Sequence, residues 1–231
     1  YVIECIWRVR LTPVYTDRLA HLATNTYLFA SRRNLFGREP RTLRILFGAN
    51  PCNKTLFSIW KDFLGIVESR LLTFWYQSDI QFLRQFPFFE TLENPGFIYS
   101  RETDNAGCVL KFSDAQREQG HRLLESMGLR REDWFICFQA RDSAYHKDVL
   151  GREENRNHRN CDVKTYLKAA DYVTKLGGAA IRLGAVVAEP LPDTGNPRII
   201  DYPTNWRTDF GDIYLAGSCR FFLSAATGVE Y

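Results

Sequence analysis

The sequence predicts an α/β fold in which parallel strands alternate with helices. Two observations support this prediction: apolar runs of strand length recur along the chain, and segments with helical periodicity separate them. In the second half, strands are predicted at 134–138, 179–183, 199–201 and 220–224. These runs are apolar on both faces, which indicates a sheet that helices cover on both sides.

Helices are predicted between these strands. Ser113 followed by Gln116 is typical of a capping box and begins a helix that is expected to end near residue 127. A second helix is predicted over 162–176, because apolar side chains recur on one of its faces. Either Asn160 or Asp162 can cap this helix.

The first half of the chain has a less regular pattern. It predicts a strand at 2–9, a helix at 17–33, a strand at 43–47 and a helix at 54–64. The segment 66–76 is compatible with a strand or with a helix. A turn-rich stretch at 94–113 is the best candidate for a domain boundary, so two domains are expected, at 1–104 and 105–231. The chain begins with a tyrosine and stops just after a loop, so both ends are expected to be cut and the second domain to be incomplete.

Composition excludes several classes of function. The formal net charge of +3 is too small to predict nucleic-acid binding. The six cysteines have no spacing that suits a zinc site or a disulfide framework, which is typical of a reducing, cytoplasmic compartment. There is no signal peptide and no apolar stretch long enough for a transmembrane helix, so we expect a cytoplasmic protein.

Positive charge is concentrated in one short segment. Its arginines are Arg32, Arg33, Arg38, Arg41 and Arg44. A solvated helix end and loop is the simpler interpretation. The functional alternative is contact with an anionic membrane surface or with a phosphorylated acceptor. Peripheral contact with the inner membrane is therefore one of the expectations.

The carboxyl ends of the predicted strands define a candidate ligand site. Parallel strands bring these ends to one edge of the sheet, and ligands of open α/β sheets bind there. The segments that follow the strands are 139–145, 184–187, 201–202 and 224–228. We therefore expect these four segments to converge on one rim.

Several residues in these segments suit a phosphate ligand. The guanidinium of Arg141 can bind a pyrophosphate through two parallel hydrogen bonds, and the alternative is a surface cluster with Asp142. The small residues of 224–228 let backbone N–H groups approach a phosphate, although steric needs alone also produce such loops. Asp201 suits a base or ribose contact, but a loop-capping role is favoured for it. No catalytic triad, P-loop or dinucleotide fingerprint is found, and no catalytic base is identified.

Short motifs in fixed order resemble a bacterial family of glycosyltransferases from surface-polysaccharide loci. That family shows patterns such as HARDSAY, RNSDIDTYL, IDY, SDFMDIYL and CRFFIGTGSG. The similar segments here are 138–145, 158–166, 182–184, 200–202, 209–215 and 219–228. A further run at 18–26 is similar to an N-terminal segment of that family. Together the similar segments cover about half of the chain. The layout is also distantly similar to the fucosyltransferase superfamily, where a His-X-Arg motif and a hydroxyl-rich loop hold a guanosine-diphosphate sugar.

The resemblance implies a GT-B-like fold of two facing Rossmann-like domains with mostly parallel sheets. Domain 1–104 would serve the acceptor and domain 105–231 would bind the donor. The implied activity is metal-independent transfer of a sugar from a nucleotide-diphosphate sugar, GDP-linked in that superfamily, to a glycan or lipid-linked acceptor. No cofactor is implied, because the nucleotide sugar is a substrate.

The resemblance and the rim together assign roles to individual residues. Arg141 and Gln139 are the expected catalytic residues, with Arg141 on the donor pyrophosphate. The expected donor-binding residues are Arg141, Ser143, Asp201, Tyr202, Ser224, Thr227 and Gly228. The residues expected to face the acceptor or the cleft are Arg18, His21, His158 and Arg159.

Two departures from the family pattern weaken the expectation of full activity. Gln139 stands where the family has histidine, although glutamine still donates and accepts hydrogen bonds. The loop at 224–228 has fewer hydroxyl groups than the family loop. Two alternatives to an active transferase therefore stay open: a nucleotide-sugar-binding module with weakened catalysis, and a structural partner in a polysaccharide assembly complex.

Overall fold

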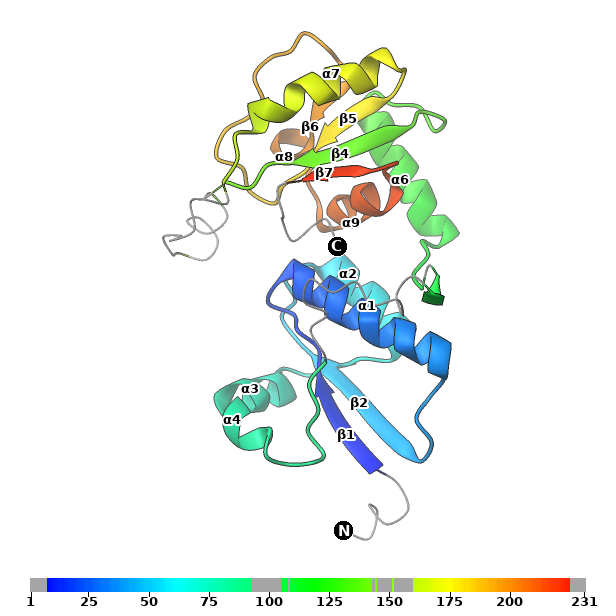
Figure 1. The fold of residues 1–231 in the computed structure, drawn as a ribbon, viewed down its shortest axis with the longest axis vertical. Helices are drawn as coiled ribbons and strands as arrows, with labels where there is room; N and C mark the ends of the chain where they lie inside the picture. Colours follow the sequence, from blue (N-terminus) through cyan, green and yellow to red (C-terminus); the bar gives the residue numbers. More distant parts are fainter. Residues whose placement is uncertain are drawn as a thin grey trace. The chain divides into compact units, whose positions relative to one another are not determined.

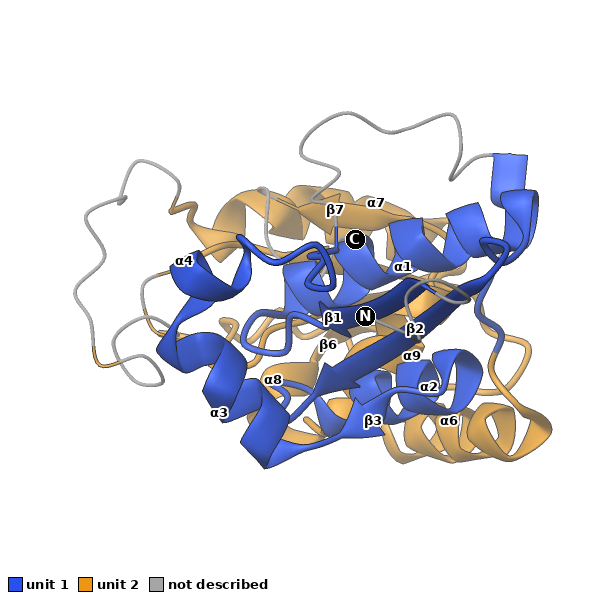
Figure 2. Cartoon of the chain, turned by 90° about the horizontal axis from the view of Figure 1, so that it is seen from below, with its two compact units in different colours: residues 1–111, 231 blue, residues 112–230 orange. Residues whose placement is uncertain are grey.

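The computed structural model describes residues 8–92, 105–107, 109–142, 144, 151 and 160–224. The chain forms two compact units, residues 1–111 with Tyr231 and residues 112–230 (Figures 1 and 2). Each unit contains a parallel sheet with helices, which confirms the predicted α/β class. In the described ranges, no helix combines the length and the apolarity that a bilayer-crossing segment needs.

Unit 1 has a three-stranded sheet in the order β1-β2-β3, and all its pairings are parallel. Its strands are β1 (Arg8–Pro13), β2 (Thr42–Gly48) and β3 (Val67–Glu68). Its helices are α1 (Leu19–Phe36), α2 (Lys54–Leu64), α3 (Arg70–Ser78) and α4 (Ile80–Leu83). The strand predicted at 2–9 therefore overlaps β1 only at Arg8 and Val9 among the described residues, since pairing with β2 continues to Pro13.

A fourth segment lies along the free edge of β1. Leu11 and Phe89 form a parallel bridge, the Leu11 N–H donates to the Phe88 carbonyl at 2.7 Å, and the Glu90 N–H donates to the Leu11 carbonyl at 3.1 Å. β1 therefore has β2 on one side and the 88–90 segment on the other. The chain first builds outward from β1 to β3 and then returns to the opposite side of β1.

Local signals explain the helix boundaries in unit 1. The Asn53 carboxamide accepts the Leu56 N–H at 2.8 Å and caps α2. Gly65, with a φ of 74°, takes the left-handed conformation that ends the same helix. α2 thus has the predicted bounds. The segment 66–76, for which the sequence left strand and helix open, contains both, because Ser69 caps α3 directly after β3.

Unit 2 has a four-stranded parallel sheet in the order β6-β5-β4-β7. Its strands are β4 (Phe135–Gln139), β5 (Ala179–Arg182), β6 (Ile199–Asp201) and β7 (Phe222–Ser224). Its helices are α6 (Asp114–Ser126), the 3₁₀ helix η3 (Val163–Tyr166), α7 (Leu167–Lys175), α8 (Tyr202–Asn205) and α9 (Asp209–Ser218).

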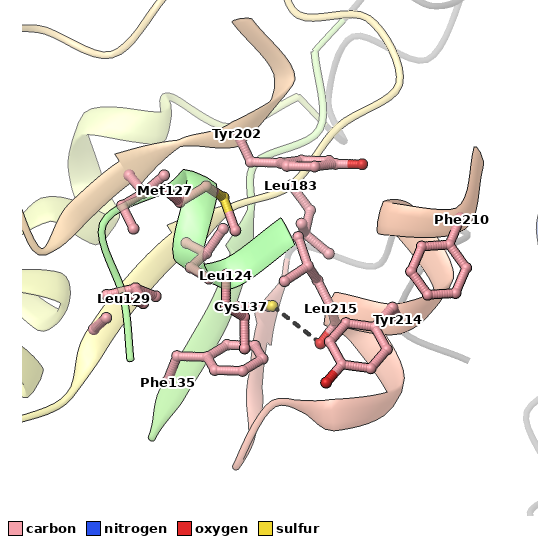
Figure 3. Packing of buried hydrophobic residues seen from close by; sticks show 13 residues of the cluster. Leu124, Met127, Leu129, Phe135, Cys137, Leu183, Tyr202, Phe210, Tyr214 and Leu215 are labelled. Atoms are coloured by element: carbon pink, nitrogen blue, oxygen red, sulfur yellow. Dashed lines mark hydrogen bonds between the residues drawn. The ribbon is translucent and has the colours of Figure 1, made fainter. Parts of the chain in front are cut away.

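The sheet of unit 2 is covered on both faces, as its apolar strands predict. Phe135 and Cys137 of β4 point into the cluster that α6 and α9 complete, and the Cys137 thiol donates to the Leu215 carbonyl at 3.4 Å (Figure 3). Ile136 and Phe138 point to the other face, toward α7. Alternate residues of one strand therefore serve two cores.

The caps at the starts of α6 and η3 can be compared with the helix starts that the sequence predicted. The predicted capping box is formed: the Gln116 N–H donates to the Ser113 hydroxyl at 3.2 Å, and the Ser113 N–H donates to the Gln116 side chain at 2.8 Å. Asp162 caps η3 by accepting the Lys164 N–H at 2.9 Å. The helix predicted over 162–176 is a 3₁₀ turn followed by α7, and α8 was not expected.

Candidate functional site

The sheet of unit 2 has a topological switch point between β4 and β7. β5 and β6 follow β4 on one side, and β7 then returns to its other side (Figure 1). The strand order therefore reverses at β4, and open α/β sheets bind ligands beyond the carboxyl ends of the strands at such a point. Gln139 and Ser224, the last residues of the two strands, are paired in the parallel register. Two predicted site residues are thus neighbours at the switch point.

Arg141 lies in the connection that leaves β4 at this point. It is half-buried, and its carbonyl accepts the Cys161 N–H at 2.9 Å. The backbone that carries its guanidinium is therefore held against the turn that precedes η3. Since Gln139 is two residues earlier, Arg141 belongs to the same rim as Gln139 and Ser224.

Asp142 connects the rim of β4 to the rim of β5. Its carboxylate accepts the Ala144 N–H at 2.9 Å and the Ala188 N–H at 3.0 Å. Both contacts go to backbone amides, so Asp142 positions two loops, which the alternative of a surface cluster with Arg141 did not anticipate. We infer that Asp142 is a positioning residue for the connection that carries Arg141.

Asn160 is a candidate that the sequence assigned to helix capping. Asp162 fills that role, and the Asn160 side-chain oxygen is buried without a hydrogen-bond partner among the described residues. The backbone N–H of the next residue, Cys161, donates a hydrogen bond to the Arg141 carbonyl, so Asn160 lies beside the connection that leaves β4. The sequence held only a weak signal for this placement: Asn160 and Asp162, two residues apart, can both cap a helix, and only one cap is needed.

Asp201 ends β6, two strands away from β4, and its carboxylate is engaged within the unit. One oxygen lies 3.2 Å from the guanidinium of Arg182, which is 2% exposed. The other accepts the Leu191 N–H at 2.9 Å and the Thr204 hydroxyl at 2.6 Å. These contacts agree with the loop-capping role that the sequence favoured for Asp201. They satisfy its carboxylate without a contact to a nucleotide sugar.

A hollow lies beside the same strand. It has a volume of about 400 Å³ and is lined by residues 191–197 together with Ile199 and Asp201. β6 stands at the opposite edge of the sheet from β7. This hollow is therefore distinct from the switch point, and strand topology favours the switch point as the nucleotide site.

The prediction of Tyr202 as a donor contact needs correction. Its side chain is 0% exposed and packs in the core between β5 and α9 (Figure 3). Its hydroxyl accepts the Thr208 N–H at 2.8 Å and lies 3.1 Å from the Asp212 carboxylate. A side chain without exposed surface cannot touch a donor in this structure, so Tyr202 is a core residue.

Asp212 is an acid that the core perturbs. Burial raises its pKa to about 6, while the neighbouring Arg207 guanidinium, 3.0 Å away, acts in the opposite direction. The hydrogen bonds around Asp212 are consistent with a raised pKa. The single proton of the Tyr202 hydroxyl can go to the Thr208 carbonyl at 2.9 Å or to Asp212, so a protonated Asp212 that donates to Tyr202 leaves both groups satisfied.

In unit 1, Arg18 and His21 lie where β1 passes into α1. Arg18 is the N-cap residue of α1, and its guanidinium is 3.7 Å from the Asp17 carboxylate. The His21 ring centroid is 5.8 Å from that of Tyr15. Both residues are thus at the carboxyl end of β1, which is the switch point of this unit because β2 and the 88–90 segment flank β1.

Five of the predicted site residues lie outside the described residues. They are Ser143, His158, Arg159, Thr227 and Gly228. Their assignments stay predictions. In the ranges that are described, no group of three or more histidine, cysteine, aspartate or glutamate side chains could hold a metal ion.

Comparison with known proteins defines the class of fold. The chain has a mixed α/β fold with parallel sheets, and this fold is structurally similar to that of a GT-B glycosyltransferase. The chain is similar to the structure of E. coli ADP-heptose LPS heptosyltransferase II, with a TM-score of 0.54 and 10% identity over 96% of this chain and 80% of that chain. No protein-family model and no curated protein matches the sequence. Membership of the surface-polysaccharide family, inferred from short motifs, therefore stays a prediction.

Proposed function

We propose that this chain is a glycosyltransferase that takes a sugar from a nucleotide-diphosphate sugar and passes it to a glycan or lipid-linked acceptor. The observation that supports this most is the meeting of Gln139, Arg141 and Ser224 at the β4–β7 switch point of a parallel sheet. The likeness to a heptosyltransferase points the same way, since ADP-heptose is a nucleotide-diphosphate sugar.

The chemistry that this site has to supply is electrostatic. Transfer needs an acceptor hydroxyl held against the anomeric carbon and stabilisation of the departing diphosphate. In the proposal, the Arg141 guanidinium neutralises the diphosphate without a metal ion, and Gln139 donates a hydrogen bond to it. Asp142 acts through Arg141, because its two backbone contacts fix the path of the loop.

Calorimetric titration with adenosine, guanosine, uridine and cytidine diphosphates tests the donor site. We expect one nucleoside diphosphate to bind selectively, and Arg141→Ala to weaken its binding by about tenfold or more, which is the range for a lost charge-assisted contact. Arg122→Ala is the matched control, since Arg122 is an exposed arginine on α6 that lies 3.9 Å from the Glu118 carboxylate. Binding that is equal in both variants would remove Arg141 from the donor site.

Gln139 favours a second candidate function, a nucleotide-sugar-binding module with weakened catalysis. The Gln139→His variant separates the two candidates. A rise in turnover with unchanged donor affinity would identify a weakened enzyme, because histidine can polarise or transfer a proton where glutamine cannot. Unchanged donor affinity with no turnover in either form would identify a binding module. A stable complex with another protein and no nucleotide affinity would instead favour the structural partner.

A further inference from the structure

An exposed patch on unit 1 combines apolar and basic side chains. It lies where α1 passes into β2 (Figure 1), and we name it the α1–β2 patch. Its members are Arg33, Leu35, Phe36, Arg38 and Arg41. Phe36 is 72% exposed and Leu35 37%, although both have the character of core residues. Large apolar side chains exposed next to each other at one helix end are typical of an interaction surface.

The charge of the patch is strongly positive. Residues 32–44 contain five arginines and one glutamate, a formal charge of +4, against +3 for the whole chain. The one acid, Glu39, is bound 2.8 Å from Arg44, which also contacts Glu90 at 2.7 Å. Arg33, Arg38 and Arg41 form no ion pair with any residue that the structure describes. Partial burial and the nearby charge of Arg38 lower the pKa of Arg33, so like charges face each other here.

Arg41 keeps its charge in an unfavourable backbone conformation. Its φ is 54°, in the left-handed region that favours glycine. Its carbonyl accepts the Arg8 N–H at 2.7 Å, which anchors the turn to the start of β1. Glycine would adopt this conformation at lower cost, and a non-glycine residue held there is a reason to look for function.

The patch is remote from the candidate site of its own unit. Arg18 and His21 are at the start of α1, next to the carboxyl end of β1, whereas the patch is at the end of α1 and at the amino end of β2. α1 has 18 residues, about 27 Å of helix, between the two places. A partner bound to the patch therefore leaves the carboxyl-end rim of unit 1 open.

We propose that the α1–β2 patch docks on an anionic lipid bilayer. Phe36 and Leu35 enter the interface between headgroups and acyl chains, and Arg33, Arg38 and Arg41 contact lipid phosphates. Charge complementarity supports this occupant, because three arginines without acidic partners among the described residues match an anionic surface. Two exposed apolar side chains beside them suit a bilayer better than a nucleic acid, whose backbone requires charge alone.

Sedimentation of the full chain with lipid vesicles tests the proposal. We expect binding to vesicles of phosphatidylcholine with phosphatidylglycerol, weaker binding as salt is raised, and little binding to phosphatidylcholine alone. Arg38→Glu should lower the partition coefficient about fivefold or more, and Phe36→Ser about tenfold, from the usual contribution of one basic and one large apolar side chain. Phe74→Ser is the matched control, because Phe74 is 69% exposed on α3, away from the arginine segment.

Arg41→Gly separates a functional from a structural effect. It removes one charge and relieves the left-handed conformation, so we expect weaker vesicle binding with thermal stability unchanged or raised. The proposal is overturned if the wild-type chain does not sediment with anionic vesicles at low salt, or if Phe74→Ser reduces binding as much as Phe36→Ser. Binding to double-stranded DNA without binding to vesicles would also overturn it.

Discussion

The buried carboxyl group of Asp212 makes the stability of unit 2 depend on pH. Asp212 is 7% exposed, with the Tyr202 hydroxyl at 3.1 Å and the Arg207 guanidinium at 3.0 Å. Burial raises its pKa from 3.8 to about 6. A group whose folded-state pKa lies above its unfolded value contributes stability that is fully present below the unfolded pKa. That stability is lost as pH rises through the folded pKa.

The size of the effect follows from the pKa difference. One pKa unit corresponds to about 1.4 kcal/mol, so ionisation of Asp212 in the folded state costs about 3 kcal/mol relative to the unfolded chain. The loss begins above pH 3.8 and is largely complete above pH 6. In Asp212→Asn the carboxamide can still donate to Tyr202 but cannot ionise. The unfolding free energy of the wild type should therefore fall by about 2.4 kcal/mol relative to that of the variant between pH 4 and pH 7.

Urea unfolding measures this difference when both proteins are followed at a series of pH values. Trp206, one of the five tryptophans, packs against the same cluster, so intrinsic fluorescence includes a signal from the relevant core. All other titrating groups are common to the two proteins and cancel in the comparison. A difference between wild type and Asp212→Asn that stays constant from pH 4 to pH 7 would show that Asp212 ionises normally, and the argument from burial would fail.

Three further predictions concern packing, capping and an acid held by arginines. Gly120→Ala places a Cβ 2.0–2.2 Å from ring atoms of Tyr214, so the variant should lose about 1–3 kcal/mol of unfolding free energy despite the better helix propensity of alanine; an unchanged melting temperature would contradict the close approach of α6 and α9. Asn53→Ala removes the cap of α2 and should cost about 1 kcal/mol in denaturant unfolding, whereas Asn53→Asp should retain most of the stability. Hydrogen bonds from the Arg130 backbone and then from arginine side chains, including Arg198, hold the pKa of Asp133 at about 2. Its contribution to stability is therefore present above pH 3.8 and lost as pH falls toward 2, and Asp133→Asn should flatten the acid limb of a pH–stability curve.

The sequence determined the local elements because their signals act over a few residues. Asn53 and Gly65 define the two ends of α2 through contacts within one helical turn. The capping box of Ser113 and Gln116 is a contact across three residues. The apolar runs of β4 and β5 predicted buried parallel strands, because apolar side chains on both faces of a strand have to be covered. The α/β class and the presence of a rim with Gln139 and Arg141 followed from these patterns.

Tertiary structure alone decided which rim residues lie next to each other and which are buried in the core or bound by neighbouring residues. Asp201 and Tyr202 lie at the end of a strand much as Arg141 does, yet Tyr202 is enclosed by the core and Asp201 is held by Arg182, the Leu191 backbone and Thr204. The return of β7 to the far side of β4, which pairs Ser224 with Gln139, is a choice of strand order. Strand order depends on contacts between residues far apart in the chain, and no periodicity within a single segment encodes them. The sequence by itself therefore specified the elements and the rim, and packing between distant segments placed the switch point on that rim.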